Sequence, residues 1–331
     1  MSVGLVLGKF APLHRGHHLL IETALAETDR TVVLIYDAPE VRTPPLQVRS
    51  KWIRELYSMV QVIEAWDGPT QTGLDPEITK LHDDYLQRRV GHLGITHFFS
   101  SEPYGWHVSL ALGATDCRVD QGRRVVPISA TEIREASFKH RQFIHPRVYR
   151  DLITKVVFLG APSTGKTTIA NELARRYQTV WMPEYGREYW EQHQTQRRLS
   201  LEQLVEIARE HRRREDLLVE NSNEVLLVDT DATTTLQFSQ YYHDTALPEL
   251  ERLADETSNR YDLCFLCQTD IPYDDTWDRS GDVNRQQMQR RIESDLISRK
   301  RQYQPLAGSI EQRCQQVIKS IKDFQFRYFG G

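Results

Sequence analysis

The segment GKFAPLHRGH, residues 8–17, gathers residue types that bind phosphate. A glycine lets the backbone approach a ligand, a lysine adds positive charge, and a proline stiffens the turn. His14 and His17 are three residues apart, so on a first helical turn they project from one face. With free backbone N–H groups and the helix dipole, they predict an anion site; the alternative is that His17 and His18 merely cap the helix. The predicted site comprises Gly8, Lys9, Phe10, His14 and His17.

A second segment, ISATEIRE at residues 128–135, is expected to complete this site. Ser129 and Glu132 have the spacing of a capping box, which predicts a helix that begins directly after the strand-like RVVPI of residues 124–128. Ser129 and Thr131 would then offer hydroxyl and backbone N–H groups. Arg134 would offer a planar guanidinium group to phosphate oxygens.

A third segment, GAPSTGKTT at residues 160–168, follows the apolar KVVFL and opens TIANELARRY. This is the complete G-x-x-x-x-G-K-T phosphate-loop pattern between an expected strand and an expected helix. Backbone N–H groups would surround the phosphates of a nucleotide, Lys166 would reach their terminal oxygens, and Thr167 would bind Mg²⁺. The predicted nucleotide-binding residues are Gly160, Ser163, Thr164, Gly165, Lys166, Thr167 and Thr168.

Acidic and basic residues farther along complete the second candidate site. Asp229 and Asp231 end the strand-like VLLVDTD, and we assign Asp229 to the metal; the alternative is two turn aspartates. Glu184 precedes an expected helix in MPEYGREYW, where a solvated helix start is the alternative. The acid-rich segment 269–292 suggests a lid whose arginine is Arg279, with Arg285 as second choice, unless it is an ordinary surface loop.

The elements that position these residues form two series. Strand-like segments at 3–7, 31–36 and 96–101 alternate with helical ones, and the pattern restarts with strands at 155–160, 224–231 and 261–270. Continuous apolar strands alternating with helices predict parallel sheets covered on both faces. The fold class is therefore α/β with two parallel-sheet domains, at residues 1–150 and 151–331. A length of 331 residues agrees with two domains.

Composition argues against several protein classes. The 42 basic and 46 acidic residues are well mixed and give a net charge of −4, so no basic field is available for nucleic acid or a membrane surface. The first apolar segment has only the five residues 3–7, and we expect a cytoplasmic protein. Cys264 and Cys267 lie in an apolar strand-like segment and are expected to be buried thiols, with metal or redox use as the alternative.

The motifs of the first half resemble those of the nucleotidyltransferase superfamily, which binds the triphosphate of ATP through H-x-G-H and I-S-x-T-x-x-R elements. The resemblance implies a Rossmann-like fold and an attack on the α-phosphorus with pyrophosphate leaving. It also implies that Lys9, His14, His17 and Arg134 neutralise charge on the pyrophosphate, with Mg²⁺ assisting.

Both halves in this order resemble NadR-type bifunctional proteins. SSEPYG at 100–105, EYGRE at 184–188 and DTDATTT at 229–235 extend the resemblance over nearly the whole chain. It implies that a P-loop kinase domain at 151–331 phosphorylates nicotinamide riboside to nicotinamide mononucleotide (NMN). An adenylyltransferase domain at 1–150 would join NMN to AMP from ATP, giving NAD. The alternative is an adenylyltransferase for another phosphate acceptor, with a P-loop domain that senses nucleotide.

The resemblance leaves several residue roles open. A carboxylate must face the 5′-hydroxyl of the riboside in the kinase half, and Glu184 and Asp231 are both candidates. Aromatic side chains should contact the nicotinamide ring, unless they pack in the core. The candidates are Trp52 and Trp106 in the first half and Tyr273 and Trp277 in the second. The expected partners are ATP, NMN and nicotinamide riboside, with no nucleic acid and no membrane; homo-oligomer formation stays open.

Overall fold

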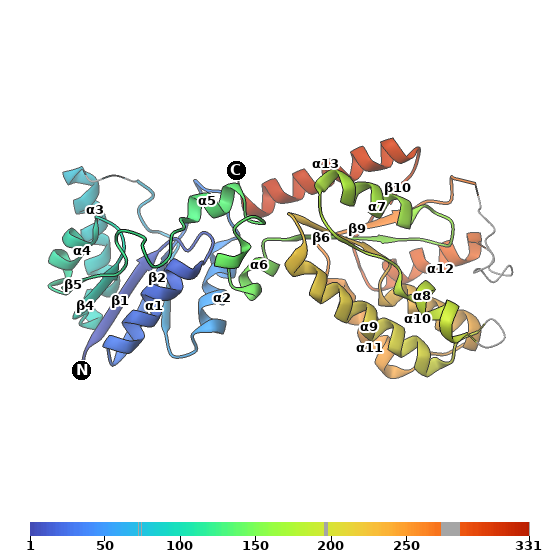
Figure 1. Cartoon of the computed structure of the whole chain (residues 1–331), viewed down its shortest axis with the longest axis horizontal. Coiled ribbons are helices and arrows are strands. Elements are labelled where there is room, and N and C mark those ends of the chain that lie inside the picture. The colour runs from blue at the N-terminus through green and yellow to red at the C-terminus, as the bar shows by residue number, and fades with distance from the viewer. Residues whose placement is uncertain (72, 74, 195–197, 273–284, 331) are drawn as a thin grey trace. The chain divides into compact units, whose positions relative to one another are not determined.

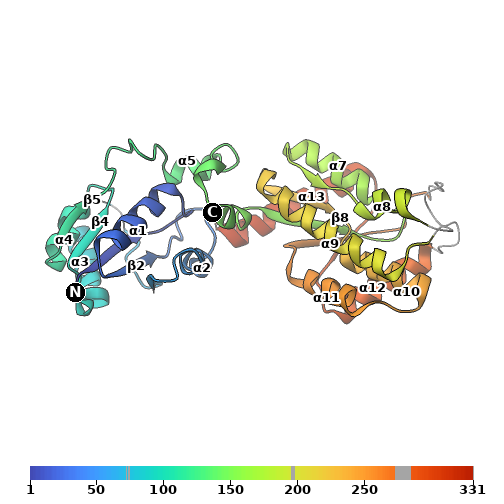
Figure 2. The same ribbon diagram turned by 60° about the horizontal axis from the view of Figure 1, so that its bottom comes forward.

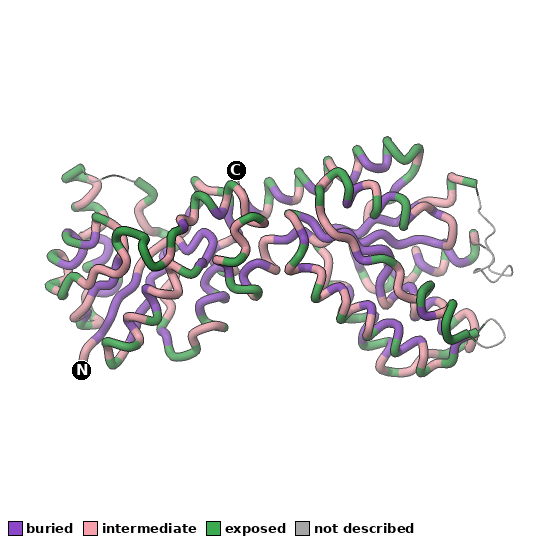
Figure 3. Tube along the Cα trace, in the orientation of Figure 1, coloured by how far each residue is buried: buried purple, intermediate pink, exposed green. Residues whose placement is uncertain are grey.

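The computed structural model describes residues 1–71, 73, 75–194, 198–272 and 285–330 (Figure 1). The chain forms two compact units. One is Met1–Leu152 together with the residues from Phe326 onward, and the other is Ile153–Gln325. In each unit, continuous apolar segments form the central strands, and buried residues concentrate along them (Figure 3).

The first unit contains a five-stranded parallel sheet with the order β3-β2-β1-β4-β5. Its strands are β1 (Val3–Gly8), β2 (Arg30–Tyr36), β3 (Gln61–Ala65), β4 (His97–Ser100) and β5 (Thr115–Arg118). Its helices are α1 (Arg15–Glu27), α2 (Leu46–Leu56), α3 (Pro76–Val90), α4 (Gly105–Leu112), α5 (Ala130–Glu135) and α6 (Pro146–Arg150). The strand order reverses direction between β1 and β4, and ligands of open α/β sheets bind at the carboxyl ends of the strands at such a point.

The second unit contains a five-stranded parallel sheet with the order β10-β9-β6-β8-β7. Its strands are β6 (Thr154–Leu159), β7 (Trp181–Met182), β8 (Val225–Asp229), β9 (Leu263–Cys267) and β10 (Gln304–Leu306). Its helices are α7 (Lys166–Tyr177), α8 (Tyr185–His193), α9 (Leu201–Leu218), α10 (Ala232–His243), α11 (Pro248–Glu256), α12 (Arg285–Ser298) and α13 (Ile310–Phe329), of which the residues from Phe326 onward belong to the first unit. Helices α7 and α13 cover one face of this sheet, and α9 and α11 lie on the other (Figures 1 and 2).

The predicted fold class, two parallel-sheet α/β domains, is confirmed. The predicted burial of Cys264 and Cys267 is also confirmed, because both are free thiols enclosed in β9. Within the described ranges, no helix has the length and apolar character needed to cross a bilayer.

The predicted strand at residues 124–128 is wrong. The chain makes bends there, because the Asp120 carboxylate accepts hydrogen bonds from the backbone N–H groups of Arg124, Val125 and Val126 at 2.7, 3.0 and 2.9 Å. A side chain thus takes the donors that a strand would give to its neighbour, and Val125 is left 71% exposed. The helix that follows does begin with the predicted capping box of Ser129 and Glu132.

Two candidate phosphate-binding sites

The first unit has a pocket of about 630 Å³ that includes the carboxyl ends of β1 and β4. The structure brings every predicted anion-binding residue of this half to its lining. These residues are Gly8, Lys9, Phe10, His14, His17, Ser129, Thr131 and Arg134.

His14 and His17 form the capping box of α1. Nδ1 of His14 accepts a hydrogen bond from the backbone N–H of Gly16 at 3.1 Å, and Nδ1 of His17 accepts from the backbone N–H of His14 at 3.3 Å. A Cβ on Gly16 would lie 2.9 Å from Cε1 of His14, which explains the glycine between the histidines. Since both Nδ1 atoms are acceptors, the proton of each neutral ring is on Nε2.

Both the predicted pocket position and the alternative of helix capping hold for these histidines, since they cap the helix and also line the pocket. The capping pair is His14 and His17 rather than His17 and His18. Burial, with the positive charges of Arg123 and neighbouring groups, lowers the pKa of His14 to about 4. Burial lowers the pKa of His17 as well. Both rings are therefore neutral in this structure and offer N–H donors to the pocket, while lysine and arginine carry its positive charge.

Among the described residues, Lys9, Arg123 and Arg134 are the lysine and arginine side chains that line this pocket. Arg134 donates to the carbonyl of Ala11 at 2.6 Å and to the Thr131 hydroxyl at 2.9 Å. Lys9 pairs with Glu40. The third cation, Arg123, was missed by the sequence analysis, and it contacts the Glu102 carboxylate at 3.2 Å. The signal that could have found it is its place beside a turn that Asp120 closes, five residues before Ile128.

Neither tryptophan candidate for the nicotinamide ring in this half lies at the pocket, and for Trp52 the alternative of core packing holds. Trp52 is fully buried on α2 and donates from Nε1 to the Asp151 carboxylate at 2.8 Å, while Trp106 is 57% exposed on α4. Neither is among the described residues that line the pocket. The aromatic side chains that do line it are Phe10, His14, His17, Tyr36, His82, Tyr104 and His107.

A buried arginine supports the loop that follows β1. Arg49 is 1% exposed on α2 and donates to the carbonyls of Pro44 and Tyr36 at 2.9 and 3.0 Å, and also to that of Lys9. Its ion pair with Asp37 spans 3.2 Å. Arg49 therefore positions the backbone beside Gly8, although the sequence analysis gave it no part in the site.

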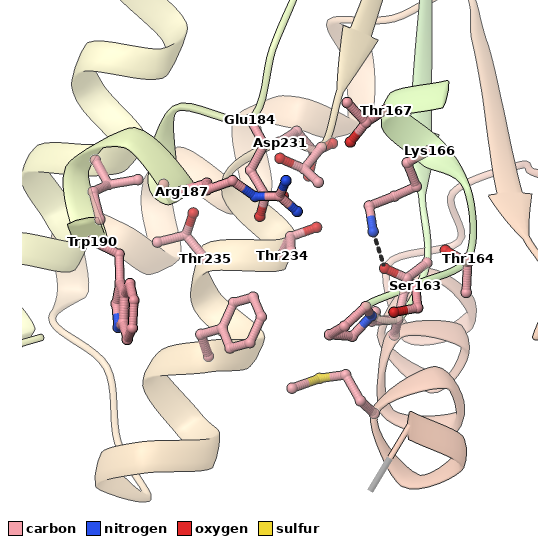
Figure 4. A pocket seen from close by; sticks show the side chains of 18 of the residues that line it. Ser163, Thr164, Lys166, Thr167, Glu184, Arg187, Trp190, Asp231, Thr234 and Thr235 are labelled. Atoms are coloured by element: carbon pink, nitrogen blue, oxygen red, sulfur yellow. Dashed lines mark hydrogen bonds between the residues drawn. The ribbon is translucent and has the colours of Figure 1, made fainter. Parts of the chain in front are cut away.

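The second unit has a pocket of about 520 Å³ around the loop between β6 and α7 (Figure 4). The structure brings together the seven predicted nucleotide-binding residues there. They are Gly160, Ser163, Thr164, Gly165, Lys166, Thr167 and Thr168.

Local geometry explains the glycines and the lysine of this loop. Gly160 has a φ of 142°, and a Cβ there would lie 2.7 Å from the carbonyl oxygen of Cys267; Gly165 has a φ of 83°. Nζ of the buried Lys166 donates to the carbonyls of Gly160 and Ala161 at 3.0 and 3.1 Å. The loop thus holds its own lysine at the edge of the pocket where a phosphate would replace those carbonyl contacts.

Residues from the C-terminal part of the second unit form hydrogen bonds with the same loop. The backbone N–H of Ala161 donates to the Gln289 side chain at 2.9 Å, and Arg313 donates to the carbonyl of Thr164 at 2.7 Å. Arg285 donates to the carbonyl of Ser163 at 2.8 Å, so this second-choice lid arginine contacts the loop. The first choice, Arg279, and the aromatic candidates Tyr273 and Trp277 lie outside the described residues.

Asp229 lies at the end of β8 against the first turn of α7. Its Oδ2 accepts from the Thr167 hydroxyl at 2.5 Å, and its Oδ1 is buried with no hydrogen-bond partner among the described residues. Burial and then the negative charge of Glu184 raise the pKa of Asp229 to about 6. A hard cation such as Mg²⁺ prefers oxygen ligands and is held by one or two carboxylates plus phosphates. The free Oδ1 beside a hydroxyl fits that donor set.

The two candidate carboxylates of the kinase half are in different environments. Asp231 caps α10, where Oδ1 accepts from the backbone N–H of Thr233 at 2.9 Å and from its hydroxyl, and Oδ2 accepts from Arg301 at 2.7 Å. Although burial opposes it, the ion pair with Arg301 and the Thr233 bonds hold the pKa of Asp231 below its usual value. Glu184 caps no N–H with its side chain, and it lies with Arg187 across the pocket from Lys166 (Figure 4).

Part of the lining of this pocket is apolar. Trp190, Phe238 and Tyr242, from α8 and α10, line it together with Leu199, Leu204 and Ile207. None of these three aromatic residues was predicted from the sequence. Trp190 stands in the quoted segment MPEYGREYW, and its spacing from Glu184 was the available signal.

Several known proteins are similar to this chain. Residues 155–313 match a family model described as an AAA domain. Two trifunctional NAD biosynthesis/regulator proteins NadR, from Escherichia coli K12 and Salmonella typhimurium LT2, are each 28% identical over 290 residues, which covers 82% of this chain and 70% of the relative.

Two solved structures are similar along the whole chain. A NadR protein in complex with NAD and AMP-PNP has a TM-score of 0.54, and a NadR protein in complex with NR has a TM-score of 0.55. Each is 21% identical, with 100% of this chain and 96% of that chain covered. At this identity the likeness shows the fold.

Proposed function

This chain is a homologue of the NadR proteins, and from that premise we propose that it is a bifunctional enzyme of NAD biosynthesis. The second unit phosphorylates nicotinamide riboside with ATP to give NMN. The first unit transfers AMP from ATP to NMN, giving NAD and pyrophosphate. The observation that carries the proposal is that each unit has its own pocket lined by a complete phosphate-binding motif.

In the first unit, an oxygen of the NMN phosphate attacks the α-phosphorus of ATP while the bond to the β-phosphate oxygen breaks. The nucleophile is already an anion, so the step needs no general base; it needs positioning and neutralisation of charge on the pyrophosphate. His14 and His17 donate Nε2–H groups to phosphate oxygens as neutral rings. Arg134, Arg123 and Lys9 supply the positive charge.

In the second unit, the 5′-hydroxyl of the riboside attacks the γ-phosphorus of ATP. Lys166 contacts the β- and γ-phosphate oxygens, and Thr167 and Asp229 would hold Mg²⁺, which neutralises phosphate charge when bound. We assign Glu184 to orient the 5′-hydroxyl and accept its proton, because both oxygens of Asp231 are committed to Arg301 and Thr233. Asp231 is then a positioning residue that fixes the start of α10.

The apolar side of each pocket suits the nicotinamide ring. In the second unit Trp190, Phe238 and Tyr242 offer flat faces in the pocket lining, and Trp190 lies across the pocket from Lys166 (Figure 4). In the first unit Tyr36 and Tyr104 take the place that Trp52 and Trp106 had in the sequence analysis. A positively charged pyridine ring is attracted to such aromatic faces.

Product analysis of the purified full chain tests the proposal. With ATP and Mg²⁺, nicotinamide riboside should yield NMN and then NAD, and NMN alone should yield NAD and pyrophosphate. Nicotinate mononucleotide and phosphopantetheine, tested in the same assay, compare other phosphate acceptors. Absence of NMN from the first reaction and of NAD from the second would overturn the proposal.

Lys166→Ala separates a kinase from a nucleotide sensor. Riboside phosphorylation should fall at least a hundredfold while the conversion of NMN to NAD persists, because the lysine contacts only the phosphates bound in the second unit. Arg175→Ala, on the exposed face of the same helix, is the matched control and should leave both activities unchanged. If Lys166→Ala changes only the kinetics of NAD formation, the second unit senses nucleotide.

A further inference from the structure

Two buried polar atoms in the pocket of the second unit have no hydrogen-bond partner among the described residues. They are Oγ1 of Thr234, on α10, and Nε2 of His211, on α9. Both residues line the pocket, and they are only 7% and 6% exposed. Buried polar atoms in folded proteins are nearly always hydrogen-bonded, so two orphans in one cavity indicate groups kept for a ligand.

The threonine next to Thr234 in the chain has a structural partner. In the run Thr233–Thr234–Thr235 on α10, the hydroxyl of Thr233 is bound to Asp231 and serves the helix cap. The Thr234 side chain lies on the side of the pocket that faces Lys166 (Figure 4). Consecutive threonines therefore divide into one with a structural hydrogen bond and one whose hydroxyl is left for the cavity.

His211 presents a lone pair rather than a proton. It forms a hydrogen bond with the backbone of Thr230, and burial lowers its pKa to about 4, so the ring is neutral. We assign the ring proton to Nδ1, because Nε2 is the nitrogen without a partner, and Nε2 is then an acceptor. An acceptor nitrogen cannot bind a phosphate oxygen, which is itself an acceptor. The group that fits Nε2 is a neutral O–H or N–H.

We propose that Thr234 and His211 form a subsite that recognises one neutral hydrogen-bond donor group of the nucleoside acceptor, either a ribose hydroxyl or the carboxamide of its base. The donor group donates a hydrogen bond to Nε2 of His211. The Thr234 hydroxyl in turn donates a hydrogen bond to the oxygen of the same group. This inference rests on the proposed nucleoside kinase activity of the second unit. It adds a requirement on the substrate that phosphate transfer alone does not impose.

Thr234→Val removes only the hydroxyl, since valine has nearly the shape of threonine. We expect the dissociation constant for nicotinamide riboside, measured by calorimetry on the full chain, to rise about tenfold, the loss of one neutral hydrogen bond. The KM for ATP should be unchanged, and the melting temperature without ligand should not fall, because no protein contact is lost. Thr234→Ser should restore binding.

Two further variants complete the test. Thr233→Val is the matched structural control: it removes the hydroxyl that binds Asp231, so its melting temperature should fall. His211→Asn keeps a polar group near the position of Nδ1 but has no atom at the position of Nε2, and it should weaken riboside binding about as much as Thr234→Val. If both side chains contact the same group, the double variant should lose less than the product of the single losses.

Substrate analogues identify the donor group. A 2′- or 3′-deoxy riboside that binds the wild type weakly but binds Thr234→Val as well as the natural riboside does would assign a ribose hydroxyl. The same pattern with nicotinic acid riboside, whose carboxylate has no donor, would assign the carboxamide. Either result supports the subsite.

Binding and turnover separate this inference from the proposed function. If the wild type binds the riboside and Thr234→Val weakens that binding, but no phosphate is transferred, the kinase activity fails and the subsite stands. If Thr234→Val and His211→Asn both bind every nucleoside within twofold of the wild type while phosphorylation proceeds, the subsite is refuted and the kinase activity stands. A wild type that binds no nucleoside would refute both.

Discussion

Asp229→Asn should stabilise the protein and abolish riboside phosphorylation. Asparagine keeps an oxygen that can accept the Thr167 hydrogen bond, but it carries no charge for Mg²⁺. The ionised carboxylate is costly in this structure because it is buried beside Glu184, which raises its pKa from 3.8 to about 6. At about 1.4 kcal/mol per pKa unit, that rise amounts to about 3 kcal/mol of destabilisation when Asp229 is ionised.

The sign of this effect sets its pH dependence. A carboxyl group whose folded pKa is raised contributes stability that is present below its unfolded pKa of 3.8 and is lost as the pH rises through about 6. Asp229→Asn should therefore match the wild type near pH 3.5. At pH 8 it should be more stable by up to about 3 kcal/mol, which corresponds to a melting temperature higher by roughly 6–12 °C.

Thermal unfolding of the full chain between pH 3.5 and 8, followed without Mg²⁺ or nucleotide, measures this difference. Asp231→Asn is the matched control two residues away, and it should act in the opposite direction. Breaking its buried ion pair with Arg301 should cost about 3–5 kcal/mol. An asparagine variant at 229 that is less stable than the wild type at pH 8 would refute the argument that burial and Glu184 dominate the environment of Asp229.

Three shorter predictions concern the first unit. His14→Asn keeps an acceptor for the backbone N–H of Gly16 but loses the Nε2 donor, so NAD formation should slow about a hundredfold. Because the pKa of His14 is about 4, the wild-type rate should show no His14 titration between pH 6 and 8. A titration near 6.5 that the variant lacks would contradict this. Trp52→Phe should lower the melting temperature by leaving the Asp151 carboxylate without its indole partner, and steady-state kinetics should show an unchanged KM for NMN. Arg123→Gln should raise the KM for ATP in NAD formation. Glu102→Gln should lower this KM, because it removes the carboxylate that competes with phosphate for Arg123. Equal effects of the two changes would argue against a phosphate contact by Arg123.

The sequence predicted those parts of the molecule that depend on local pattern. Three strands of each sheet were visible because they are continuous apolar segments such as VVLIY and KVVFL, whereas the outer strands β3, β5 and β10 were not predicted. The phosphate loop was visible because glycines at fixed spacing are required by its backbone. The segment RVVPI has the same apolar character. It is not a strand because the carboxylate of Asp120 takes its donors, and residue propensities do not register such a contact.

Parts of the sites that depend on distant contacts were out of reach. Whether Glu184 or Asp231 is available as a base is decided by Arg301, which is 70 residues from Asp231 in the chain. Trp52 and Tyr36 are both plausible ring contacts by residue type. The direction of each side chain depends on which face of its helix or strand packs inward, and Asp151 holds Trp52 away from the pocket.

The double use of His14 and His17 restricts how this chain can diverge. Replacing either ring removes a capping hydrogen bond of the first turn of α1 together with a candidate phosphate contact. A homologue that lost the activity would therefore also need another cap for this helix. Gly16 is subject to the same constraint, because the side chain of any larger residue would clash with the His14 ring. We therefore expect homologues to keep or lose these three positions as a set, even where the surrounding surface has drifted beyond recognition.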